Sequence, residues 1–223
     1  MEPKSKFLNR KQTIQVVKNL KSADLNLEYD FEKHRFNWEE QGRAFGLRLP
    51  ITIYGNEEGE VDLERVVTYI MLLVQSGSAS VGVFKHEECL SHKVFGSYMV
   101  RKKQGKSQIK HLKTKGKSRA GSRMRLASGA EMFENVNERL RRHFSEHEFD
   151  RIAFSCSKIL LPFLFSAKTE TPFDKKEPKI FKIPKHLHQP NFQVMLGMQR
   201  FINQGELILP SEVEEGDLFY LRS

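Results

Sequence analysis

The chain has 223 residues, of which 39% are hydrophobic and 29% charged, with a formal net charge of +9. A chain of this size and composition buries a sizeable core, which excludes an intrinsically disordered protein and favours one α/β domain with extensions, or one domain with a small subdomain. No apolar run approaches the roughly 18 to 20 residues of a bilayer-spanning helix, and the basic N-terminus lacks the apolar region of a secretory signal. We therefore expect no membrane association.

The first 75 residues carry three local patterns. Within residues 1–30, one short element is predicted from the apolar residues Ile14, Val16, Val17 and Leu20. Alternation and β-branched residues in 45–54 predict a strand, with Pro50 at an edge or a bulge. After a loop at 55–59, Asp62 can cap a helix that runs to about Gln75. Its apolar residues fall at helical spacing, namely Leu63, Val66, Val67, Ile70 and Val74.

The middle of the chain predicts a hairpin, a loop and a long helix. Strands at 79–84 and 90–100 flank a short polar turn. Small polar residues and two glycines predict a loop over 109–122. From about Arg123 to Phe144 the pattern becomes helical, and one face carries Leu126, Ala130, Phe133, Val136 and Leu140.

The last third predicts shorter elements. Residues 151–157 form a strand, 159–166 a helix or a strand, and 180–183 a short strand, with a polar connection at 167–179. A helix follows Pro190 over 191–202. This alternation of strands and helices predicts an α/β fold, a mixed sheet with packed helices.

The charge is concentrated in one segment. Between Cys89 and Ala130 there is no Asp or Glu, yet this stretch holds twelve Lys or Arg residues. Removing these twelve charges from +9 leaves −3 for the remainder. Like charges at this density repel one another, and a polyanion would relieve that repulsion and release counterions. The alternative is a solvated basic face, which would usually interleave Glu with Lys. We expect RNA or another polyanion to be the partner.

Metal-binding patterns are incomplete. His86, Cys89 and His92 have ligand-like spacing, but side chains three apart on a strand point to opposite faces, and no fourth ligand follows. The histidines at 186 and 188 have the same deficiency. We expect neither a metal nor another cofactor.

Nucleophilic and nucleotide-binding motifs are also missing. Cys89 and Cys156 stand outside any activating pattern and are expected to be reduced thiols. The GKS triplets at 105–107 and 116–118 lack the upstream glycine of a phosphate-binding loop.

One short motif inside the basic segment remains as a candidate for chemistry. Gly105 permits close approach of the backbone to an RNA terminus. The amide of Gln108, three residues later, cannot act as a general base. It can hold a water molecule against an ester carbonyl or donate hydrogen bonds to the developing oxyanion. The alternative is a basic loop that only binds RNA.

These residues resemble a known family. The stretch Leu73–Phe144 contains LSHKVFGSYMVRKKQGKSQ and GKSRAGSRMR, and its strand–KxGxxQ–loop–RAGSxxR arrangement resembles the release-factor-like peptidyl-tRNA hydrolases of ribosome-associated quality control. The resemblance continues through LLPFLFSA and KIPKHLHQPNFQVMLGMQRF in Arg151–Ile202. It implies a fold similar to the middle, catalytic domain of archaeal and eukaryotic class I release factors. Those factors place two glycines directly before the glutamine, where this chain has Lys106 and Ser107.

The resemblance implies a ribosome-associated peptidyl-tRNA hydrolase that releases nascent chains from stalled complexes. Gln108 and Gly105 would form the catalytic site. Together with the charge pattern, it assigns RNA binding to Arg101, Lys102, Lys103, Lys106, Lys110, Lys113, Lys115, Lys117, Arg119, Arg123 and Arg125. The alternatives are an endonuclease that cuts the tRNA acceptor end and a non-catalytic factor that binds rRNA or tRNA.

The expected organisation and context follow from the same motifs. Residues 1–45 are expected to form an N-terminal extension, 46–205 the catalytic domain, with its basic loop at about 101–125, and 206–223 a C-terminal tail. The expected partners are the ribosome or its large subunit and peptidyl-tRNA. The protein is expected to be cytoplasmic and a monomer when free.

Overall fold

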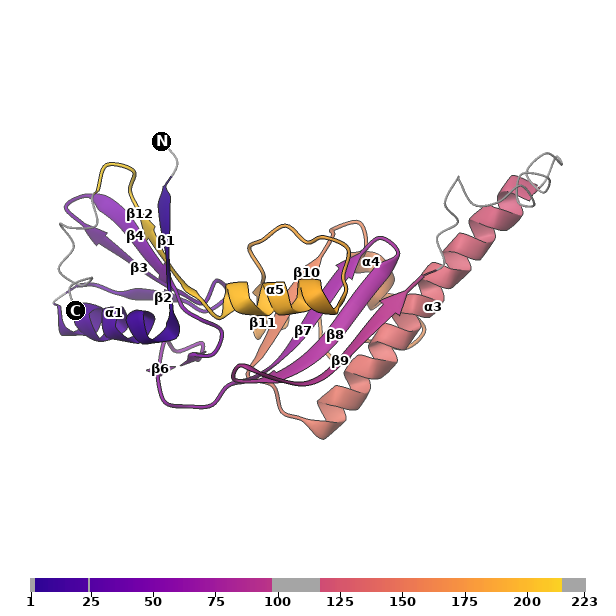
Figure 1. The fold of residues 1–223 in the computed structure, drawn as a ribbon, viewed down its shortest axis with the longest axis horizontal. Coiled ribbons are helices and arrows are strands. Elements are labelled where there is room, and N and C mark those ends of the chain that lie inside the picture. The colour runs from indigo at the N-terminus through magenta and orange to yellow at the C-terminus, as the bar shows by residue number, and fades with distance from the viewer. Residues whose placement is uncertain (1–2, 24, 98–116, 214–223) are drawn as a thin grey trace.

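The computed structural model describes residues 3–23, 25–97 and 117–213, without the side chains of residues 117–128. The described strands form two five-stranded sheets and a two-stranded ribbon. Helices pack against both large sheets (Figure 1). The prediction of an α/β fold with a mixed sheet and packed helices is confirmed.

The first sheet is antiparallel and joins distant parts of the chain. Its strands, in spatial order, are β1 (Lys4–Leu8), β12 (Gly205–Leu209), β4 (Arg43–Arg48), β3 (Arg35–Glu40) and β2 (Glu28–Asp30). Strand β12 pairs with both β1 and β4. The sheet therefore combines four strands from the first 48 residues with one strand that begins at Gly205.

Helix α1 (Arg10–Ser22) covers this sheet, and its start is fixed by local sequence. The side chain of Asn9 accepts a hydrogen bond from the amide of Gln12, while the Gln12 side chain accepts one from the amide of Asn9. This capping box satisfies two amides that a helix start leaves unpaired. The short element predicted in this region is thus a helix, with Thr13, Val16, Val17 and Leu20 buried.

The second sheet is mixed and contains the predicted hairpin. Its spatial order is β11 (Ile180–Lys182), β10 (Arg151–Cys156), β7 (Thr68–Gln75), β8 (Ser78–Lys85) and β9 (Glu88–Gly96). Strand β10 is parallel to β7 and β11, while the β7–β8 and β8–β9 pairs are antiparallel. The strands predicted at 151–157 and 180–183 are confirmed within one residue at their ends.

Helices cover both faces of this second sheet. Helix α3 (Lys117–Glu146) and the short α4 (Leu161–Phe165) share a core with one face. Helix α5 (Phe192–Ile202) packs on the other face. The side chain of Asn191 accepts from the amide of Val194 and caps α5, which confirms the helix predicted after Pro190.

The helix predicted from Asp62 to Gln75 is wrong. Residues 61–62 form strand β6, which pairs with β5 (Tyr54–Gly55), and Thr68–Gln75 is the central strand β7. Alternate residues of β7 enter different cores, since Ile70 and Leu72 face α3 whereas Met71 and Leu73 face α5. A strand buried on both faces has a continuous apolar run, and such a run also contains helical spacing.

Three smaller expectations also differ from the structure. The region predicted as one strand over 45–54 is divided, because β4 ends at Arg48 and Pro50 lies outside the strands. The predicted loop includes residues 117–122, which are the first residues of α3. Ala130, placed on the apolar face of this helix, is exposed, whereas Phe133, Val136 and Leu140 are buried as predicted.

Candidate functional site

Residues 98–116 of the basic segment are flanked by strand β9 and helix α3. Strand β9 ends at Gly96, and the amide of Ser97 donates to the carbonyl of Gly77 at 2.9 Å. The described chain resumes at Lys117, the first residue of α3. Gly105 and Gln108 therefore lie outside the described residues. The same holds for the predicted RNA-binding residues Arg101, Lys102, Lys103, Lys106, Lys110, Lys113 and Lys115.

The remaining predicted RNA-binding residues lie on the first part of α3. Their backbone is helical, and they are Lys117, Arg119, Arg123 and Arg125. The helix has 30 residues, which corresponds to a length of about 45 Å. In Figure 1 its N-terminal part projects well beyond the sheet, while its C-terminal part lies against β8 and β9. The structure thus places these four backbone positions on a helical projection.

The sequence of the projecting part is unfavourable for an isolated helix. Its first turn contains no acidic residue, and the first glutamate of α3 is Glu131. A helix N-terminus carries a partial positive charge and unpaired amides, so cationic residues there are repelled and anions are attracted. RNA phosphates would supply the missing negative charge. This end of α3 therefore fits a polyanion better than it fits water alone.

Specific contacts fix the other half of α3 on the domain. Asn137 is fully buried, and its side-chain amide donates to the carbonyls of Leu164 at 2.9 Å and Thr169 at 2.7 Å. The guanidinium of Arg139 donates to the hydroxyl of Ser91 on β9 at 2.7 Å. These two residues were missed by sequence reasoning, because a polar residue within a helical pattern carries no mark of its burial. They hold the helix that carries the basic residues.

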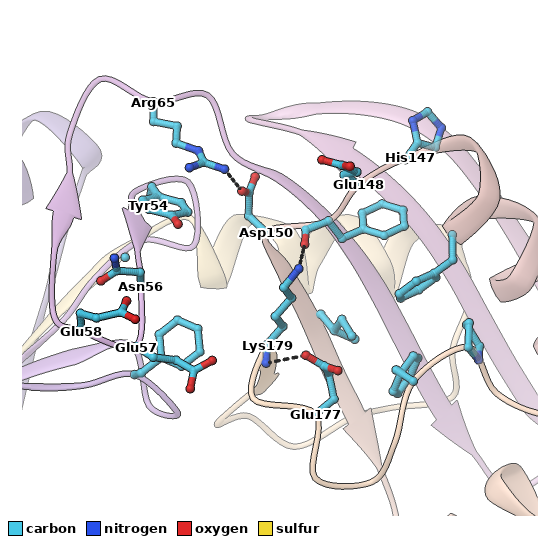
Figure 2. A pocket seen from close by; sticks show the side chains of 17 residues that line it. Tyr54, Asn56, Glu57, Glu58, Arg65, His147, Glu148, Asp150, Glu177 and Lys179 are labelled. Atoms are coloured by element: carbon cyan, nitrogen blue, oxygen red, sulfur yellow. Dashed lines mark hydrogen bonds and ion pairs between the residues drawn. The ribbon is translucent and has the colours of Figure 1, made fainter.

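The cavity at the opposite end of α3 has a different character. It has a volume of about 580 Å³, and Phe144 and His147 from this end of the helix help to line it. Figure 2 shows His147 and Glu148 along one side and Glu57 and Glu58 on the far side. Its lining contains five carboxylates but only two permanent cations, Arg65 and Lys179. This cavity is therefore unsuited to RNA.

The two cysteines lack the properties of nucleophiles. Both are free thiols. Burial raises the pKa of the Cys156 thiol to about 12 and also raises that of Cys89, which disfavours the reactive thiolate.

The histidines with ligand-like spacing make ring contacts. The ring of His92 stacks on Phe192 with 3.9 Å between ring centroids. His186 and His188 pack edge to face at 5.4 Å.

Comparisons with known proteins identify relatives of the part of the chain that contains the basic segment. The sequence model of the family described as Bacteroidetes VLRF1 release factor matches residues 69–207, which run from β7 to β12. A bovine protein described as "tRNA endonuclease ANKZF1" (Bos taurus) is 26% identical over 149 residues. This match covers 61% of the present chain but only 20% of the bovine protein.

One solved structure is similar in outline. The structure described as "Vms1 mitochondrial localization core" aligns with 90% of this chain and 84% of its own length, at 12% identity and a TM-score of 0.46. Within the described ranges, no helix combines the length and the apolar character that crossing a bilayer requires.

Proposed function

The chain belongs to the Bacteroidetes VLRF1 release factor family, and from this premise we propose that it hydrolyses the ester between a stalled nascent peptide and its tRNA. The observation that carries the proposal is that the basic segment runs into the projecting N-terminal end of α3. That segment includes Gln108, and the helix beside it is fixed to the sheet by Asn137 and Arg139. A basic segment carried on such a helix can enter a site lined by RNA while the sheet domain remains outside.

In the proposed reaction, Gln108 acts through its amide and not as a base. Its carbonyl oxygen accepts from an attacking water molecule, or its NH₂ group donates to the oxyanion that forms on the ester carbonyl. A ribose hydroxyl of the tRNA can relay a proton from the attacking water to the ribose oxygen that leaves when the ester bond breaks. The absence of a side chain at Gly105 lets the backbone approach the acceptor end of the tRNA.

The lysines and arginines around Gln108 have a separate role in the proposal. Each phosphate that they neutralise releases counterions, which provides affinity without sequence specificity. The partner is therefore an RNA surface recognised by its charge. We propose the ribosome or its large subunit, with peptidyl-tRNA as the substrate, and a cytoplasmic monomer as the free form.

A second candidate is cleavage of the tRNA itself near its acceptor end. The description of the bovine relative as a tRNA endonuclease favours it. The same basic segment would bind the same RNA in both cases, so the charge pattern does not distinguish ester hydrolysis from cleavage of the tRNA. The bond that is broken separates them.

The discriminating experiment examines both products from large subunits loaded with labelled peptidyl-tRNA. Ester hydrolysis yields a free peptide and a tRNA of full length with an intact 3′ end. Endonuclease activity yields a peptide that still carries terminal nucleotides and a shortened tRNA. A free peptide together with a full-length tRNA supports the proposal, and a shortened tRNA overturns it in favour of the nuclease. A chain that binds loaded subunits without changing either molecule is a non-catalytic factor.

A further inference from the structure

The last turn of α3 brings together two histidines and a glutamate. His143, Glu146 and His147 are spaced i, i+3 and i+4, which places them on one helix face. The amide of His147 donates to the carbonyl of His143 at 2.9 Å, so the helical register continues to this residue. One potential ligand atom from each of the three side chains lies within 4.8 Å of the other two.

His143 is anomalous for a buried polar residue. The residue is 2% exposed, and neither ring nitrogen has a hydrogen-bond partner among the residues that the structure describes. The Oε2 of Glu146 lies 3.7 Å from its Nδ1, which is beyond hydrogen-bond distance. Leaving a buried polar group unpaired destabilises the folded state. A ligand between these side chains would remove part of this destabilisation.

We infer that His143, Glu146 and His147 bind a divalent transition-metal ion of the zinc class. Zinc binds histidine nitrogen and carboxylate oxygen at about 2.0–2.2 Å, so neighbouring ligand atoms lie about 3.3 Å apart. The separation of 3.7 Å between His143 and Glu146 is close to this value. Two histidines at i and i+4 on one helix face are a known zinc-binding arrangement.

The type of ligand selects the class of ion. Mg²⁺ and Ca²⁺ prefer sites made of oxygen atoms, whereas imidazole nitrogens suit zinc, copper, iron and nickel. A site with two imidazoles and one carboxylate has three protein ligands, which leaves the fourth position of a tetrahedral zinc ion for water. His147 also lines the cavity of Figure 2, so that water can enter from the cavity.

A neighbouring residue already orients the carboxylate. The guanidinium of Arg142 donates through Nε to the Oε1 of Glu146 at 2.8 Å, which leaves Oε2 facing His143. Hydrogen bonds of this kind around a metal site hold a ligand in its binding orientation. Glu146 is 42% exposed, so its side chain has room to close on an ion.

The position of the site indicates a structural role. Lys117 and His143 are separated by 26 residues of α3, or about 39 Å along the axis, so an ion here cannot reach a substrate at the projecting end. It would instead link the three ligand side chains and so stabilise the final turn of the helix. The inference does not depend on the proposed hydrolase activity.

Metal binding is tested with the untagged full-length chain after chelator treatment and dialysis. We expect one Zn²⁺ per chain, and Co²⁺ as a spectroscopic probe should give visible absorption bands characteristic of nitrogen ligation. His147→Ala and Glu146→Gln should each weaken Zn²⁺ binding by about tenfold or more. Both positions are at least partly exposed, which favours folding of these variants.

The matched control removes the other close histidine pair. His186→Ala combined with His188→Ala should bind Zn²⁺ as the wild type does. Hydrogen exchange provides a readout unrelated to activity, because zinc should slow exchange at residues 140–147 in the wild type but not in His147→Ala. Unchanged affinity in either site variant, or loss of binding in the control, overturns the inference. So does the absence of zinc-dependent protection in the last turn.

Discussion

The hydroxyl of Tyr29 lies 2.5 Å from Nδ1 of His34, a ring that is completely buried. Burial raises the pKa of Tyr29, which keeps this hydroxyl protonated as the hydrogen-bond donor. The other ring nitrogen of His34, Nε2, lies 3.0 Å from the carbonyl of Pro50 and donates to it. The two contacts together require a neutral ring with its proton on Nε2.

This contact predicts a loss of stability in acid. Burial, and next the charge of Arg151, lower the pKa of His34 to about 3, well below about 6.5 for an unfolded histidine. Between about pH 6.5 and 3, His34 is protonated in the unfolded chain but stays neutral in the folded protein. The free energy of unfolding therefore falls as the pH decreases through this range, by up to about 1.4 kcal/mol per pH unit.

The variant His34→Asn tests this linkage, because asparagine tolerates the positive φ of 52° at this position and does not titrate. Urea unfolding at several pH values between 7 and 4.5 should give a shallower slope for the variant than for the wild type. Lower stability at pH 7 is expected from the lost packing. Equal slopes in the two proteins would refute the assignment to His34.

The contact between α1 and β12 predicts the effect of one glycine substitution. A Cβ atom at Gly205 would collide with the Thr13 side chain, lying 3.0 Å from its Cγ2 and closer still to its Oγ1. Thr13 is buried and donates to the carbonyl of Asn9 at 2.8 Å, so it cannot easily rotate away. Gly205→Ala should reduce the free energy of unfolding by about 1–3 kcal/mol.

A second glycine provides the control. Gly197 lies within helix α5, and a Cβ atom there meets nothing within 4 Å. Gly197→Ala should therefore stabilise the protein by about 0.5–1 kcal/mol. Opposite signs in denaturant unfolding are expected for the two variants. A neutral or stabilising Gly205→Ala would show that Thr13 yields to the added methyl group.

The ion pair beside the cavity predicts an asymmetry between its partners. Asp150 accepts from Arg65 at 2.5 Å and also from the amide of Thr68, at the start of β7, at 2.8 Å. Arg65 is 47% exposed, so Arg65→Ala should cost less than about 1 kcal/mol. Asp150→Ala also leaves the Thr68 amide without this acceptor and should cost about 1–3 kcal/mol. Equal losses in urea unfolding would contradict this account.

The sequence predicted elements well where one local pattern was sufficient. The hairpin β8–β9 was predicted from two strand-like segments around a short polar turn, and helix α5 from its position after Pro190. Strand β7 was misassigned because its alternate residues enter two different cores. Strand β12 could not be recognised from local sequence, because its partners β1 and β4 lie about 160 residues or more earlier in the chain.

In the candidate site, too, features with a local sequence pattern were predicted and features set by tertiary contacts were not. The concentration of positive charge is visible in the sequence alone. A long helix after this segment was predicted from about Arg123, but its first residues were assigned to the loop, because Gly116 and Gly121 were interpreted as signs of a loop; residues 117–122 are helical. The roles of Asn137 and Arg139 depend on partners on α4, on the loop after it and on β9. Contacts of that kind are set by the tertiary fold and have no local signature.

Binding to ribosomes should depend on the charges of the basic segment. Reversal of Lys102, Lys103 and Arg123 to glutamate should weaken binding to large subunits and reduce the salt dependence by about 0.7–0.9 per lost phosphate contact on a log–log plot. The control changes the net charge equally at exposed lysines elsewhere, namely Lys158, Lys168 and Lys176. Equal weakening in both triple variants would indicate a response to net charge alone.

The central claim concerns the amide at position 108, and the rate of peptide release from purified large subunits loaded with peptidyl-tRNA tests it most directly. Gln108→Ala should reduce this rate by about 100-fold or more, as removal of a single oxyanion donor does in other enzymes, without loss of co-sedimentation. Gln104→Ala, four residues earlier in the same segment, should release peptide at the wild-type rate. Normal release by Gln108→Ala would contradict the proposed mechanism.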